Sequence, residues 1–206
     1  MKYLLKTVPG GPILNNCYIL TCAVTKKTAI IDPSMNAECV LNALASIEDA
    51  EVAAIINTHG HFDHIMANAQ VKKATGAKIM LHEADLEMLK HGYGYTFNPL
   101  YATDIDITLK GGEILEVGEL KIEVIHTPGH SPGGVCLYCE DLLFSGDTLF
   151  RLEIGRCDLP GGDLEQLINS IKEKLLPLPD SVQVLPGHYD GSTIGEERAA
   201  NPHLIS

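Results

Sequence analysis

The chain has 206 residues, of which 45% are hydrophobic and 20% are charged, and its formal net charge at pH 7 is −12. This length fits a single domain spanning residues 1–206, and the composition is that of a globular rather than a disordered protein. Because no cluster of Lys and Arg offsets the acidic charge, the sequence lacks the electrostatic signature of nucleic-acid binding, and we expect no nucleic-acid partner.

The N-terminal residues 1–6 carry an apolar core that is too short for a signal peptide, and no apolar stretch is long enough to span a membrane. We therefore expect a cytoplasmic protein with no membrane partner. Its six cysteines are then expected to be reduced thiols. Nothing in the pattern indicates an oligomeric state.

Short apolar and β-branched runs, most of them bounded by Gly, Pro, Asn or Asp, predict strands along the whole chain. In chain order they cover residues 3–8, 17–21, 28–31, 52–57, 78–81, 105–109, 114–117, 121–125, 134–138, 142–144 and 182–185. Helical patterns cover residues 36–46, 63–75, 83–90 and 163–175. Residues 91–103, rich in Tyr, Gly, Asn and Pro, predict a long surface loop of the kind that often carries function.

The order of these elements predicts an α/β protein. Hairpin-like strands come first, then alternating helices and strands, then strands again, and finally a helix and a last strand. Such a pattern implies sheets covered by outer helices. On its own it fits a sandwich of two mixed sheets and a single doubly wound sheet equally well.

Potential metal ligands are concentrated in one short segment, where His59, His61, Asp63 and His64 fall within six residues. Neutral imidazole and carboxylate are the usual ligands of zinc and similar divalent ions. One ion does not comfortably take four side chains spaced so closely, so we expect the ligands to be divided between two ions.

Three further candidate ligands each follow a strand-like segment. His130 lies in His-Thr-Pro-Gly-His, Asp147 in Ser-Gly-Asp-Thr and His188 in Pro-Gly-His. Three imidazoles on one ion, and a carboxylate with two imidazoles on the other, leave one carboxylate to bridge them. Asp147 is the expected bridge.

Two ions about 3.5–4 Å apart can share a water, lower its pKa toward about 7 and present hydroxide while polarising a carbonyl oxygen. This is hydrolytic chemistry without a protein nucleophile. No nucleophile elbow, phosphate-binding Walker loop or dinucleotide-binding glycine motif competes with it in the sequence.

The pattern H-x-H-x-D-H, followed by a lone His, an Asp and a late His, resembles the metallo-β-lactamase superfamily over essentially the whole chain. The resemblance implies a four-layer αββα sandwich of two mixed β-sheets flanked by helices, with the metals at one edge. The implied first-metal ligands are His59, His61 and His130, and the implied second-metal ligands are Asp63, His64 and His188, with Asp147 bridging. Asp63 and Asp147 are thus also the catalytic candidates.

Within that superfamily, residues 144–150 and 154–163 and the ending around Gly187-His188-Tyr189 resemble the short bacterial form of the glyoxalase II-like hydrolases. The resemblance implies a small-molecule thioester substrate such as S-lactoylglutathione, and two divalent metal ions, with zinc as the default and iron or manganese as alternatives. Full-length glyoxalase II enzymes carry a C-terminal helical extension that contacts the glutathione carboxylates, and the chain as given ends at Ser206 without one. The physiological thioester is therefore left open.

Two alternative activities remain at this stage. A persulfide dioxygenase of the same superfamily resembles this pattern but uses a single iron held by two His and one Asp. A hydrolase of another ester or lactone is the other alternative. β-Lactam cleavage is disfavoured, because those enzymes usually lack an Asp at the bridging position.

Arg156 and Tyr189 are the candidate substrate contacts. Arg156 is also placed to pair with Asp158 or Asp163, and Tyr189 fits a packed aromatic equally well. Asp32, which ends an apolar strand, fits either a turn cap or a buried acceptor, and the resemblance favours an acceptor that supports a metal ligand by hydrogen bonding.

The remaining histidines and cysteines are given structural roles. We expect His126 to be structural or to support a metal ligand rather than to bind metal itself, and His82, His91 and His203 to be solvated. Cys136 and Cys139 should point to opposite faces of one strand, and Cys157 should be a packed thiol.

Overall fold

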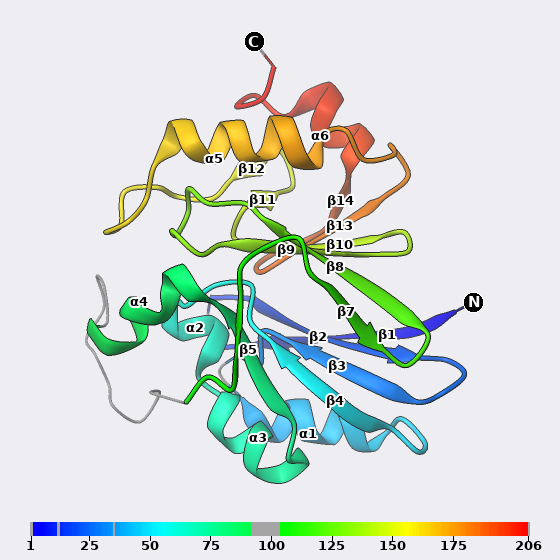
Figure 1. Ribbon diagram of the computed structural model, residues 1–206. Coiled ribbons are helices and arrows are strands. Elements are labelled where there is room, and N and C mark those ends of the chain that lie inside the picture. The colour runs from blue at the N-terminus through cyan, green and yellow to red at the C-terminus, as the bar shows by residue number, and fades with distance from the viewer. Residues whose placement is uncertain (1, 12, 35, 92–103, 206) are drawn as a thin grey trace.

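The computed structural model describes residues 2–11, 13–34, 36–91 and 104–205. It contains two six-stranded sheets packed face to face, with helices on both outer faces (Figure 1). This is the predicted αββα sandwich of two mixed sheets, and it excludes the single doubly wound sheet that the pattern alone allowed.

The first sheet has the strand order β1-β2-β3-β4-β5-β6. Strands β1 to β3 pair antiparallel, and β3 to β6 pair parallel. Its strands are β1 (Tyr3–Gly10), β2 (Asn15–Cys22), β3 (Lys27–Ile31), β4 (Glu51–Ile56), β5 (Lys78–His82) and β6 (Ile107–Leu109).

The second sheet has the strand order β14-β13-β10-β9-β8-β7, and only β10 and β13 pair parallel. Its strands are β7 (Ile114–Val117), β8 (Leu120–His126), β9 (Val135–Cys139), β10 (Leu142–Gly146), β13 (Gln183–Pro186) and β14 (Ser192–Thr193). A small hairpin of β11 (Leu149–Phe150) and β12 (Glu153–Ile154) follows β10.

The hydrophobic core is divided into three layers. The layer between the sheets includes Leu20, Leu137 and Phe144, whose ring packs edge-on against Tyr18 with centroids 5.2 Å apart. Alternate residues of β2 and β9 belong to different layers, so Cys139 lies between the sheets whereas Cys136 lies under the outer helix. The two cysteines therefore point to opposite faces, as predicted.

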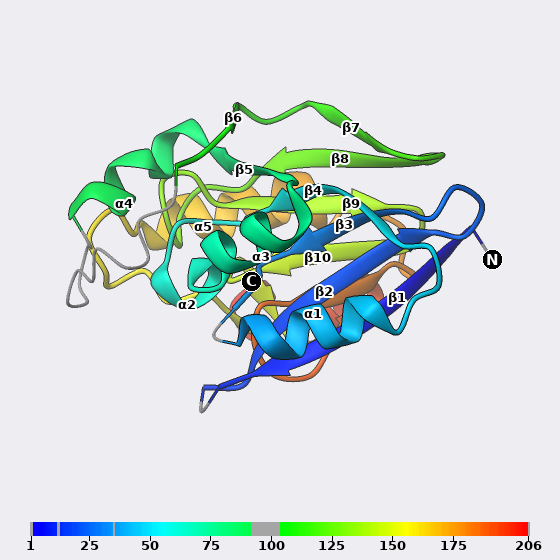
Figure 2. The ribbon, with the colours of Figure 1, turned by 90° about the horizontal axis from the view of Figure 1, so that it is seen from below.

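The helices cover the outer faces of the sheets, as Figures 1 and 2 show from two directions. On the first sheet they are α1 (Ala37–Ala45) and α3 (Asn68–Thr75), whose buried Val40 and Val71 pack on strand residues such as Ile55. On the second sheet they are α5 (Leu164–Ser170), which continues as a π-helical turn over Ile171–Leu175, and α6 (Ile194–Ala200). No helix in the described part of the chain is long and apolar enough to cross a membrane.

The helix predicted over residues 63–75 is wrong as a single element. The structure has α2 (Phe62–Ile65) and then α3, because the backbone N–H of Ala67 donates to the Pro33 carbonyl instead of continuing the α2 ladder. The pattern at 83–90 forms a 3₁₀ turn, Glu83–Asp85, followed by α4 (Leu86–His91). Of the predicted loop 91–103, residues 92–103 lie outside the described residues.

Candidate metal centre

The seven predicted ligands come together at one edge of the sandwich. His59, His61, Asp63 and His64 follow β4 of the first sheet, whereas Asp147 and His188 follow the parallel strands β10 and β13 of the second. His130 lies in the loop between β8 and β9. The carboxyl ends of β4, β10 and β13 thus supply most of the site, in keeping with the tendency of ligand sites to gather outside such strand ends.

His59, His61 and His130 form a first triad whose ligand atoms lie within 4.8 Å of one another. Nε2 of His130 is 3.3 Å from Nε2 of His59 and 2.8 Å from Nδ1 of His61. Nitrogens bound tetrahedrally to zinc at about 2.0–2.1 Å are separated by about 3.3 Å. The spacing of the first triad therefore fits one divalent ion.

Asp63, His64 and His188 form a second triad of the same kind. The Nε2 atoms of His64 and His188 are 3.3 Å apart, and Oδ2 of Asp63 is 3.3 Å from the latter. Asn15 Nδ2 donates to the same Asp63 oxygen at 3.0 Å and holds the carboxylate in place.

Asp147 lies between the two triads. Its Oδ1 is 3.3 Å from Nε2 of His64, and its Oδ2 is 3.6 Å from Nε2 of His130 in the other triad. Oδ1 is buried and accepts no hydrogen bond from the described residues. An orphaned carboxylate oxygen between two sets of converging imidazoles fits a bridge between two cations.

Glycine is required close to this carboxylate. A Cβ on Gly187 would lie 2.4 Å from Oδ1 of Asp147 and 2.6 Å from Cε1 of His64. The glycine in the Pro-Gly-His sequence therefore lets the end of β13 lie close enough to the centre for His188 to reach the second triad.

Hydrogen bonds fix the orientation of four of the five imidazoles. Nδ1 of His130 contacts the Arg156 carbonyl at 2.8 Å, and Nδ1 of His188 contacts the Ile13 carbonyl at 2.9 Å. A carbonyl only accepts, so Nδ1 of each ring carries a proton and Nε2 is the nitrogen left to bind a metal. His61 differs, because its Nδ1 faces the triad.

Asp32 orients the other two imidazoles, as predicted. Its Oδ2 is 3.0 Å from Nδ1 of His64 and accepts from the Thr58 hydroxyl at 2.6 Å. That hydroxyl lies 3.1 Å from Nδ1 of His59. Asp32, His59 and His64 also lie close enough together to form a third candidate metal-binding group. The Asp32 carboxylate, however, already accepts hydrogen bonds from the Thr58 hydroxyl and the Thr58 N–H and contacts His64.

The two triads differ electrostatically. Burial, together with the neighbouring imidazoles, lowers the pKa of His59 far below its usual value and that of His61 to about 3. In the second triad burial also acts against the charged form, but Asp147 and Asp63 outweigh it and raise the pKa of His188 to about 10. His59 and His61 are therefore neutral at pH 7, whereas His64 and His188 hold protons in the metal-free protein.

A cavity of about 600 Å³ opens onto the centre. Arg156 and Tyr189 both line it, as the candidate substrate contacts should. The Arg156 guanidinium, however, is paired with both carboxylate oxygens of Asp158, at 2.7 and 2.8 Å. Tyr189 is 66% exposed at the mouth.

Sequence reasoning overlooked Arg151, which also lines this cavity and has no ion-pair or hydrogen-bond partner among the described residues. An apolar wall that includes Ile13, Phe150 and Leu159 accompanies it. The only signal in the sequence was its position four residues after Asp147.

His82 was predicted to be solvated, and this is wrong. It is 4% exposed and stacks on His126, with ring centroids 4.0 Å apart, because both residues end strands at the same side of the sandwich. Nε2 of His126 contacts the Pro132 carbonyl, which agrees with the structural role expected for it. The His203 ring is 39% exposed and lies beside Glu153. The side chain of His91 is not among those that the structure describes.

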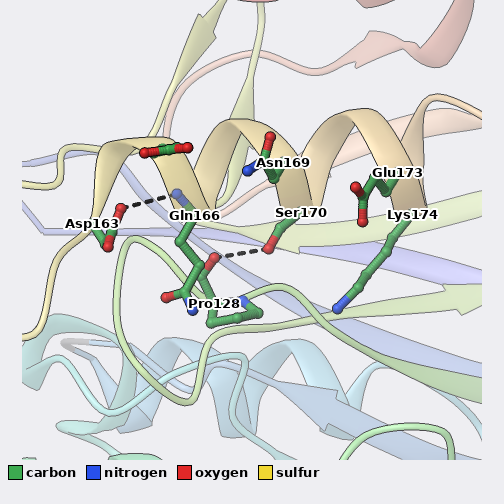
Figure 3. Close-up of a pocket in the computed structure, with 8 residues that line it drawn as sticks. Pro128, Asp163, Gln166, Asn169, Ser170, Glu173 and Lys174 are labelled. Atoms are coloured by element: carbon green, nitrogen blue, oxygen red, sulfur yellow. Dashed lines mark hydrogen bonds between the residues drawn. The ribbon is translucent and has the colours of Figure 1, made fainter.

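A second cavity, of about 400 Å³, runs along α5 (Figure 3). It is lined by polar side chains such as Gln166, Asn169 and Lys174, together with the Asp163 carboxylate, which caps α5 by accepting from the Gln166 N–H at 2.9 Å. None of the predicted site residues lines it.

Comparison with known proteins gives a consistent result. Residues 10–188 match the family described as the Metallo-beta-lactamase superfamily. The hydroxyacylglutathione hydrolase GloC of Haemophilus influenzae is 34% identical over 210 residues, which cover 98% of each chain.

Two solved structures resemble the chain over nearly its whole length. The BLEG-1 B3 metallo-beta-lactamase is 38% identical with a TM-score of 0.91, covering 98% of this chain and 100% of its own. TTHA1623, in a di-iron-bound form, is 36% identical with a TM-score of 0.80, covering 96% of this chain and 98% of its own.

Proposed function

Because the chain belongs to the metallo-beta-lactamase superfamily, and because its two donor triads meet at Asp147, we propose that it is a metal-dependent hydrolase that cleaves a small-molecule acyl thioester. The position of Asp147 between the triads is the observation that carries the proposal. Zinc is the proposed ion, although the same nitrogen and oxygen donors accept iron and manganese. The proposed location is the cytoplasm.

Divalent ions bound by the two triads would lower the pKa of a shared water toward about 7 and polarise a carbonyl oxygen. The protein keeps the two carboxylates at the centre ionised. Burial opposes ionisation of Asp63, but His64 and the hydrogen bonds from His188 and Asn15 hold its pKa at about 2. Asp63 and Asp147 are therefore in their ligand form at neutral pH.

No cysteine in the described ranges supplies an activated thiol near the centre. Cys157 follows Arg156 and donates to the Gly155 carbonyl at 3.5 Å, while burial raises its pKa. A neutral, packed thiol is a poor nucleophile. This environment supports attack by water rather than by a cysteine.

The thioester is supported by the similarity to GloC, which is named as a hydroxyacylglutathione hydrolase, and by the cavity. An apolar wall next to an unpaired guanidinium suits a substrate with an acyl group at one end and an anionic group at the other. We assign that anion contact to Arg151, because Arg156 is already neutralised by Asp158.

The proposal is tested by following thiol release from S-lactoylglutathione with the purified protein, before and after chelation and after reloading with zinc. We expect activity that disappears with the chelator and returns with about two ions per chain. Asp147→Asn should lose at least about a hundredfold in kcat, because it weakens both sites. Asp180→Asn is the matched control and should stay within about twofold, because this exposed acid precedes β13 and lies at the opposite end of that strand from His188.

The outcomes separate the alternatives. Zinc-loaded protein that leaves the thioester intact would contradict the proposal. Oxygen uptake with a persulfide and about one iron per chain would then identify a dioxygenase, whereas cleavage of a β-lactam, a lactone or another ester would identify a different hydrolase.

A further inference from the structure

A buried acid outside the metal ligands joins the loops that carry the first triad. Asp85, in the 3₁₀ turn that follows β5, is 0% exposed. Its Oδ2 accepts from the Gly60 N–H at 2.9 Å and from the Ser131 hydroxyl at 2.8 Å, and its Oδ1 accepts from the Gly133 N–H at 2.6 Å. No Lys or Arg in the described ranges forms an ion pair with it.

Two of these donors are immediate neighbours of first-triad ligands, and the third, Gly133, lies in the same loop as His130. Gly60 lies between His59 and His61 in the loop after β4, and Ser131 follows His130 in the loop after β8. The loop after β4 follows a strand of the first sheet, and the loop after β8 follows a strand of the second. The Asp85 carboxylate therefore bonds to both of the segments that must meet if all three imidazoles are to bind one ion.

The fit around this carboxylate is tight. A Cβ on Gly133 would lie 2.7 Å from Cγ of Asp85, and a Cβ on Gly60 would lie 3.3 Å from its Cβ. A buried carboxylate without a cation is costly unless hydrogen bonds satisfy it, and here three donors do so. The spacing between the loops is thus fixed without any metal.

The contacts are also selective for one triad. None of the three hydrogen bonds involves a neighbour of His188, and the direct contact to Nδ1 of His64 in the second triad comes from a different acid, Asp32. We propose that Asp85 is a positioning residue that sets the affinity of the first metal site and leaves that of the second unchanged. This inference rests on the metal assignment of the proposed function and not on the identity of the substrate.

The test is a zinc titration of metal-free protein against a competing chelator, which needs no substrate. We expect Asp85→Asn to weaken one of the two sites by at least about tenfold, because the new amide group faces an N–H donor, and to leave the other site unchanged. Glu197→Gln is the control. Glu197 is equally buried and accepts from the Leu152 N–H and from Asn201, away from both triads, so its loss should lower stability and leave both affinities unchanged.

Paired substitutions identify the affected site. In a His188→Asn background, which retains the first triad, Asp85→Asn should keep its full effect, and in a His61→Asn background it should have none. Gly133→Ala places a methyl group against the Asp85 carboxylate and should displace it. This substitution should therefore weaken zinc binding at the first site and leave the second site unchanged. If Asp85→Asn does not fold, Ser131→Ala removes a single donor and should cause a smaller loss at the same site.

Equal weakening of both sites, or no change at either, would overturn the role of Asp85. A wild-type protein that binds two ions but cleaves no thioester would contradict the substrate alone, and the titration would still decide the role of Asp85.

Discussion

Arg151 is the side chain on which the charge preference of the cavity depends. Because its guanidinium has no partner in the described chain, a substrate anion would gain a charge-assisted hydrogen bond there without breaking an existing ion pair. We expect Arg151→Gln to raise KM for S-lactoylglutathione about tenfold with kcat within about twofold. Arg156→Gln is the matched comparison and should change KM less. An equal effect of the two substitutions on KM would count against the assignment.

The imidazoles of the second triad should release protons when metal binds. Carboxylate neighbours raise the pKa of His64 well above its usual value and that of His188 to about 10, despite the opposing effect of burial. At pH 7.5 both rings are protonated in the metal-free protein, so filling this triad should release about two protons. His59 and His61, whose pKa values are lowered, should release none when the first triad is filled. Calorimetry in buffers of different ionisation enthalpy measures this number, and His188→Asn should reduce it by about one. A total near zero would show that the second triad is not charged.

The same shifts determine how the stability of the metal-free protein depends on pH. The pKa values of His64 and His188 are raised above the unfolded value of about 6.5. Their contribution to the free energy of unfolding is therefore complete below about pH 6.5 and is lost as the pH rises toward about 10.

At the scale of elements, the centre depends on where helices stop. The sequence pattern over residues 63–75 predicts one continuous helix. The helix is instead interrupted between α2 and α3, where the Ala67 N–H donates to the Pro33 carbonyl. The short α2 can then turn Asp63 and His64 into the site while α3 packs independently on the first sheet. Periodicity reports the buried face of a helix and does not report a tertiary hydrogen bond that interrupts it.

The elements missed from the sequence are short or lack a clear pattern. The hairpin of β11 and β12 has two residues in each strand, and α6 is only seven residues long. The α6 helix is nonetheless signalled by Thr193 and Glu196, which form a capping box and bond reciprocally at its N-terminus. That signal could have been recognised before the structure was known.

Over the whole molecule, the convergence of the seven candidate ligands was predictable because sequence spacing and chemistry restrict it directly. Seven side chains from four separate segments do converge at one edge, as the motif implied. The network that orients them was predicted only in part. Asp32 ends a strand with an unexplained charge, whereas Asp85 and the stacking of His82 on His126 arise from contacts between the two sheets, which no local pattern encodes.

We propose that the sandwich holds two metal ions bridged by Asp147. A crystal structure of the zinc-loaded protein, with anomalous differences recorded at the zinc edge, would locate them. We expect two peaks about 3.5–4 Å apart, one among His59, His61 and His130 and the other among Asp63, His64 and His188, with the Asp147 carboxylate between them. A single peak at full zinc loading, or two peaks with Asp147 bound to neither, would contradict this proposal.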